Sequence, residues 1–174
     1  MAFWITGRRE YRETAIRGMR RLAILAGHLR LKRDGDLLVG GNLGESHAIG
    51  VLGHIYDLLV PADLSSRDDS AFRSLLEATR AASDTCAHLA CGNHNTWSLV
   101  GRLSVALSLG NPQWLHDGLY GCQCPAGWRY GLIHQLRHDI LADGMHWERT
   151  LGYHYYTLMG LTDAADMLSN SGVD

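Results

Sequence analysis

Hydrophobic residues recur at spacings of three and four along most of the chain, which is the pattern of amphipathic helices packed on a core. The first stripe predicts a helix over 11–31, and its inward positions are Ile16, Met19, Ala23 and Ala26. A glycine-rich loop is predicted over 31–46. Ser46 is then the expected N-cap of a second helix, which Pro61 ends.

The same spacing predicts a series of further helices. They cover 97–109, 113–119, 128–141 and 151–168, together with a helix that opens at Asp68 or Asp69 and runs towards Ala90. Strand-like alternation is confined to 37–39. The fold class expected is therefore all-α, either a bundle or a stack of helical hairpins. The 20 glycines favour hairpins with functional loops between them.

Length and charge restrict the classes of partner. The 174 residues suffice for a single domain, 1–174, and the net charge of −2 provides no global basic field for nucleic acid or a membrane surface. An acidic polymer would need a local basic cleft. No apolar run reaches the length of a membrane span, and Arg8 and Arg9 interrupt any signal-peptide core. This N-terminus suits a cytoplasmic protein or a chain whose true beginning is missing.

The possible metal ligands have weak spacing. The four cysteines form two pairs in the sequence, Cys86 with Cys91 and Cys122 with Cys124. Neither pair has the C-x2-C spacing typical of zinc, and the histidines His134 and His138 lack a third ligand nearby in the sequence. We therefore expect no metal or other cofactor in this chain and assign the two histidines a structural role.

Two junctions between a loop and a helix carry the candidate chemistry. The first, 91–97, contains Asn93 and His94, and either Asn93 or Asn95 is expected to begin the following helix. The second, 143–156, contains Thr150 as a predicted N-cap, which places Tyr153 and His154 in the first helical turn. Free N–H groups and partial positive charge at helix N-termini suit an anionic ligand. Each residue also has an ordinary interpretation, as a cap, a surface histidine or a core aromatic.

The motifs of these junctions resemble a known family. Asn93-His94 followed by Thr96-Trp97, and later Asp-Gly…Glu-x-Thr-x-x-Tyr-His-x-Tyr over 143–156, look like the α-helical toroid domain of the alginate lyase and heparinase II/III-like polysaccharide lyases. The resemblance begins near Ser46. It implies a partial (α/α) toroid of helical hairpins. It also implies that the chain is a fragment, and that the absent remainder includes a C-terminal β-sandwich domain with a zinc site.

The resemblance implies β-elimination on a uronic-acid polymer. Asn93 and His94 would neutralise the uronate carboxylate and stabilise the enolate that forms when C5 loses its proton. Tyr153 would act as the general base, the general acid for O4, or both, although in some subfamilies the base is a histidine. Gly92 stands where the family often has another asparagine, and Thr150 where a serine is common.

Substrate-binding roles follow from the same resemblance. The residues expected to contact or position the polymer are His154, Arg149, Trp97, Trp147 and Glu148. The resemblance also implies a periplasmic or secreted protein. Arginines are further candidates for anion contacts, namely Arg102, Arg129, Arg137 and Arg149, of which Arg102 and Arg137 also fit solvated helix faces.

Two other functions stay open. One is a toroid glycoside hydrolase acting on uronides, which needs two carboxylates across the sugar. Its candidates are Asp84, Asp139, Asp143 and Glu148. The other is a carbohydrate-binding helical module without catalysis, in which Trp97, Trp128 and Trp147 would serve as stacking platforms.

Overall fold

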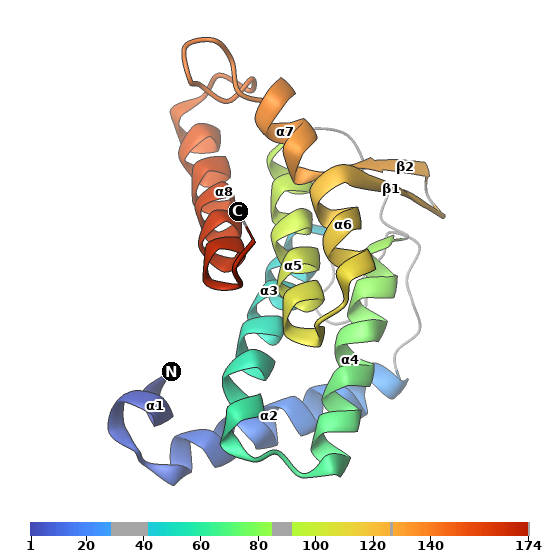
Figure 1. Ribbon diagram of the computed structural model, residues 1–174, viewed down its shortest axis with the longest axis vertical. Helices are drawn as coiled ribbons and strands as arrows, with labels where there is room; N and C mark the ends of the chain where they lie inside the picture. Colours follow the sequence, from blue (N-terminus) through green and yellow to red (C-terminus); the bar gives the residue numbers. More distant parts are fainter. Residues whose placement is uncertain (29–41, 85–91, 126, 174) are drawn as a thin grey trace.

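The computed structural model describes residues 1–28, 42–84, 92–125 and 127–173. In these ranges the chain is mostly helical, as predicted, with one short hairpin (Figure 1). The elements are α1 Ala2–Thr6, α2 Arg9–His28, α3 Asn42–Leu59, the 3-10 helix η1 Val60–Ala62, α4 Ser66–Asp84, α5 Asn93–Leu109, α6 Pro112–Tyr120, β1 Gly121–Cys124, β2 Gly127–Tyr130, α7 Leu132–His138 and α8 Leu151–Asn170.

Helix α5 is the centre of the molecule and packs against α3, α6 and α8 (Figure 1). Every residue from 95 to 106 is buried, including serines and an arginine. The contact with α3 is close because glycines face it. A Cβ at Gly101 would lie 2.8 Å from the carbonyl oxygen of Ser46, and Ser104 Oγ donates to Gly50 O at 3.0 Å. The buried hydroxyls thus find backbone acceptors on the neighbouring helix.

Two apolar clusters lie on either side of this helix. The first joins α2, α3 and α4, with the buried side chains Ile16, Met19, Ile49, Leu52, Tyr56, Phe72, Leu75 and Leu76. The second joins α5, α7 and α8 through Trp97, Val100, Leu103, Leu132 and Ala164. The inward stripes predicted for the helices beginning near residues 11 and 68 are confirmed at Ile16, Met19 and Phe72.

Several predicted boundaries were wrong. Helix α3 begins at Asn42, so Ser46 is a buried helical residue and not an N-cap. The helix predicted over 128–141 is a strand followed by a short helix, because β1 and β2 pair antiparallel and α7 starts only at Leu132. A four-residue strand places only two residues on each face, which is the shortest run in which alternation can be recognised. The predicted strand 37–39 and the segment 85–90 lie outside the described residues.

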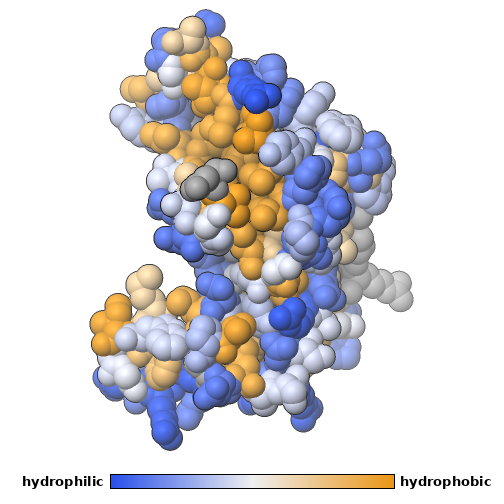
Figure 2. All heavy atoms as spheres, in the orientation of Figure 1, coloured by the Kyte–Doolittle hydropathy of each residue, from blue (hydrophilic) through white to orange (hydrophobic). Residues whose placement is uncertain are grey.

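Helix α8 covers one side of α5 and exposes much of its own surface. Its exposed apolar residues include Leu151, Tyr155, Leu158 and Met159. Figure 2 shows apolar side chains gathered on this face of the molecule, along α8 and beside it. Within the described ranges, no helix combines the length and the apolarity needed to cross a bilayer.

Candidate functional site

The first junction is the buried N-terminus of α5. Gly92 is the N-cap, with a φ of 139° that glycine adopts readily and other residues rarely do. Asn93 is the first residue of the helix and is 6% exposed, so the prediction that Asn93 or Asn95 caps this helix was wrong. His94 follows and is half-buried. Asn95 is buried and donates its side-chain amide to Tyr130 O at 3.3 Å.

A carboxylate from a distant part of the chain accepts hydrogen bonds from the N-terminus of α5. Glu148 Oε2 accepts the backbone N–H of Asn93 at 3.2 Å, and both carboxylate oxygens accept from Asn93 Nδ2, at 3.0 and 2.8 Å. A carboxylate bonded to the first N–H groups of a helix is stabilised by the helix dipole. The structure therefore brings the two predicted junctions together, although the residues are 55 positions apart.

A buried histidine lies behind Glu148. His146 is fully buried, with Nδ1 3.3 Å from Glu148 Oε2 and Nε2 4.0 Å from Asp139 Oδ2. Burial lowers the pKa of His146 and outweighs the two carboxylates, which act to raise it. Burial thus favours the neutral imidazole between the two carboxylates. Its backbone N–H donates to His154 Nδ1 at 3.2 Å, so a neutral His154 carries its proton on Nε2.

The second junction is the exposed N-terminus of α8. The predicted cap is confirmed, because Thr150 Oγ1 accepts the backbone N–H of Tyr153 at 3.1 Å. Tyr153 is 51% exposed in the first turn, and Tyr155, two residues on, is 61% exposed. Arg149 precedes the cap with a positive φ of 53° and is also exposed. A ligand in solution can therefore reach the phenol of Tyr153.

The two tryptophans expected to bind sugar lie in different surroundings. Trp97 is 7% exposed, and its ring lies 4.2 Å from that of His47 and 5.2 Å from that of Tyr156. It also lines a cavity of about 290 Å³ between α3, α5 and α8. Trp147 is 47% exposed, and a Cβ on Gly92 would lie 3.9 Å from its ring. Trp147 thus stands at the surface beside the α5 N-terminus.

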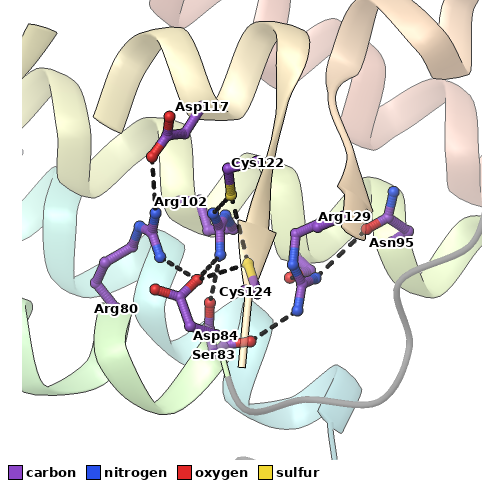
Figure 3. A network of polar contacts seen from close by, with 10 residues as sticks. Arg80, Ser83, Asp84, Asn95, Arg102, Asp117, Cys122, Cys124 and Arg129 are labelled. Carbon is purple, nitrogen blue, oxygen red and sulfur yellow. Dashed lines mark hydrogen bonds and ion pairs between the residues drawn. The ribbon is translucent and has the colours of Figure 1, made fainter. Parts of the chain in front are cut away.

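Two of the arginines considered as anion contacts are buried. Arg102 and Arg129 are both 0% exposed, so the solvated helix face considered for Arg102 was wrong. Arg102 pairs with Asp84, and Arg129 donates to Ser83 O at 2.8 Å (Figure 3). Arg129 also donates to Ser98 Oγ at 2.9 Å. The other two, Arg137 and Arg149, are exposed.

The site includes residues that the sequence did not single out. Gln135 on α7 accepts from Thr96 Oγ1 at 2.7 Å and donates to Gly92 O at 3.1 Å. His146, although within the second motif, had no assigned role. Among the described residues no group of three or more histidine, cysteine or acidic side chains could hold a metal ion. The rings of His134 and His138 instead pack together, 4.2 Å apart.

Comparisons with family models, with curated proteins and with solved structures found no match. The resemblance to polysaccharide lyases, which rests on the motifs around Asn93 and Tyr153, therefore stays a prediction from the sequence.

Proposed function

We propose that this chain is a polysaccharide lyase domain that cleaves a uronic-acid polymer by β-elimination. The observation that carries the proposal is the direct contact of Asn93 with Glu148, which joins the two motifs of the resemblance at one place. Tyr153 lies in the first turn of α8, five residues after Glu148 in the chain, and is exposed to a polymer in solution. Elimination needs hydrogen-bond donors for the uronate carboxylate and a group that takes the C5 proton, and Asn93 and Tyr153 are residues of these two kinds.

In this proposal Asn93 and His94 stabilise the uronate as its C5 proton leaves. Asn93 already selects a carboxylate, that of Glu148, as its partner. Both contacts of its amide nitrogen go to Glu148, so donation to a substrate carboxylate requires that one Glu148 oxygen give up its bond. Glu148 is then a positioning residue, which orients Asn93 and does not take the C5 proton.

Tyr153 is the proposed base for C5 and the proposed acid for O4. His154 donates from Nε2, because Nδ1 is occupied by the N–H of His146. Trp147 and Arg149, both exposed at the same junction, are proposed to contact the sugar and its charge. Because Trp97 is buried, we propose that it contacts substrate only where a sugar enters the cavity that Trp97 lines.

We also propose the toroid arrangement for the helices. Helices that are next but one in the chain pack side by side, α2 with α4 and α3 with α5. In a ring with an inner and an outer layer, successive helices alternate between the layers. Each helix therefore lies beside the next but one in its own layer. The open flank of α8, rich in exposed apolar residues, is then the side where the ring continues.

The hydrolase alternative has less support. Asp139 and Glu148 lie on opposite sides of His146, so a buried imidazole fills the space that a sugar would need between two carboxylates. Asp84, another candidate, is bound by Arg80 and Arg102. No specific contact favours these acids as a catalytic pair.

The test is the ultraviolet absorbance of the unsaturated uronate, measured with a panel of uronic-acid polymers. Tyr153→Phe is expected to lower the rate at least about 100-fold, the usual contribution of an acid or base. Tyr155→Phe is the matched control, since it removes an equally exposed hydroxyl from the same helix and should leave the rate unchanged. Equal losses in both variants would contradict the assignment of Tyr153.

Other outcomes separate the alternatives. New reducing ends without absorbance would indicate hydrolysis. A polymer that raises the thermal unfolding temperature without any cleavage would indicate a binding module. Absence of absorbance, cleavage and thermal shift with every polymer would overturn the proposal altogether.

A further inference from the structure

A second cluster of reactive groups lies on the far side of α5 from α8, where the hairpin meets α4. Cys122 and Cys124 are the first and last inward positions of β1, and their sulfur atoms are 3.4 Å apart (Figure 3). Side chains two apart on a strand point to the same face, so the Cys-x-Cys spacing brings the thiols together once the hairpin forms. The sequence alone gave this spacing no such meaning.

Charged groups surround the two sulfurs. Arg102 Nη2 donates to Cys122 Sγ at 3.1 Å, and the thiol of Cys124 donates to Asp84 Oδ1 at 3.5 Å. Asp84 also binds Arg80 and Arg102, and Arg80 lies 3.8 Å from Asp117. A negative charge that forms on Cys122 would therefore lie beside a buried guanidinium, an environment typical of reactive cysteines.

The two thiols differ in access. Cys122 is half-buried, whereas Cys124 is 5% exposed. Burial, and then the hydrogen bond with Cys122, raises the pKa of Cys124 to about 11. Cys122 can thus meet a reagent from solution, while Cys124 can react only with a neighbour inside the protein.

We propose that Cys122 and Cys124 form a thiol–disulfide exchange site, in which Cys122 attacks a disulfide substrate and Cys124 resolves the product. In the first step the Cys122 thiolate, its proton lost to water, attacks one sulfur of the disulfide and releases one thiolate. The Cys124 thiol then loses its proton and attacks Cys122 Sγ, which releases the second thiolate. Two protein thiols are oxidised and one disulfide is reduced to two thiols.

The geometry requires a small movement for this reaction. A disulfide bond is about 2.05 Å long, so the sulfurs must approach by about 1.4 Å from their present separation of 3.4 Å. Asp84 accepts the Cys124 hydrogen bond, but it is a weak base. Burial would raise the pKa of Asp84, and the charges of Arg102 and Arg80 outweigh burial and lower it. Resolution by Cys124 is therefore the slow step.

Tryptic mapping after incubation with oxidised glutathione tests the site. Cleavage after Arg80, Arg102 and Arg129 places the cysteine pairs on separate peptides, 81–102 and 103–129. In the native protein, peptide 103–129 is expected to lose two hydrogens as its internal disulfide forms. Closure should accelerate as the pH is raised from neutral, by up to about tenfold per unit, since the Cys124 thiolate becomes more abundant.

Two variants separate the roles of the thiols. Cys124→Ser should accumulate a stable glutathione adduct on Cys122, because the resolving thiol is gone. Cys122→Ser should react at least about tenfold more slowly, because the remaining thiol is buried. Circular dichroism confirms that each variant is folded before the reaction.

Three results would overturn the proposal. One is a glutathione adduct that forms first on Cys124. Another is a disulfide that joins the two peptides. The third is a peptide 103–129 that stays reduced in the folded protein but oxidises in urea. Because the readout is a mass change, it is independent of lyase activity.

Discussion

The two helices that carry the candidate residues begin in contrasting ways. The α5 N-terminus is buried, and its first N–H is bonded to Glu148 from another part of the chain. The α8 N-terminus is exposed, and the side chain of its N-cap, Thr150, accepts the backbone N–H of Tyr153. A buried terminus needs a partner that excludes water, whereas an exposed one can be completed locally. Under the proposed function, Glu148 positions Asn93 at the buried terminus, and Tyr153 contacts the polymer at the exposed one.

Glu148→Ala should have the largest effect on stability. It removes an ionised acceptor from two buried donors of Asn93, which is expected to lower the free energy of unfolding by about 2–4 kcal/mol. Glu148→Gln keeps the shape and one acceptor, so about half of that loss is expected. Urea denaturation followed by circular dichroism measures both. A loss below about 0.5 kcal/mol in the alanine variant would show that the contact does not hold the α5 N-terminus.

The packing of α8 on α5 is tested by a pair of glycines. A Cβ at Gly160 would lie 2.9 Å from Thr96 Cγ2, so Gly160→Ala should destabilise the protein by about 1–3 kcal/mol through overpacking. Gly152, in the first turn of the same helix, has open space around its Cβ position. Gly152→Ala should therefore stabilise by up to about 0.5–1 kcal/mol. Equal effects in thermal unfolding would mean that α8 does not pack as described.

Thr150→Ala tests how much the exposed N-terminus of α8 contributes to the free energy of unfolding. Loss of the cap should cost about 1 kcal/mol, less than the loss of Glu148, since water can replace the hydroxyl. Thr162→Ala is the matched control, because Thr162 lies on the exposed face of the same helix and bonds only its own helix, at Leu158 O. Its effect should be near zero. A Thr150 effect larger than that of Glu148→Ala would reverse the contrast drawn between the two junctions.

The smallest expected effect is a pH dependence from His146. Its pKa in the folded state is below the ordinary 6.5, so below that pH the unfolded chain binds a proton that the folded protein does not. The contribution of His146 to the free energy of unfolding is therefore complete above pH 6.5. It decreases as the pH falls from 6.5 to the pKa of His146 in the folded state, and below that pKa it decreases no further. The groups facing the imidazole are Glu148, Asp139 and His154. The slope of unfolding free energy against pH in this window should flatten in His146→Asn.

Local patterns in the sequence were sufficient for much of the fold. The spacing of apolar residues predicted most of the helices, because a helix must bury one continuous stripe. Thr150 was predicted correctly as a cap, since a cap bonds to an N–H only three residues away. The junctions at Asn93 and Tyr153 were also identified in the sequence from residue types that recur at such sites.

Only the tertiary structure decided which of these residues meet. The contact of Glu148 with Asn93 spans 55 positions, and the burial of His146, Arg102 and Arg129 depends on helices distant in the chain. The hairpin that pairs the two thiols has strands of four residues, the shortest run in which alternation can be recognised. Sequence periodicity reports the face that a segment buries, whereas the partner that it buries against is fixed by packing alone.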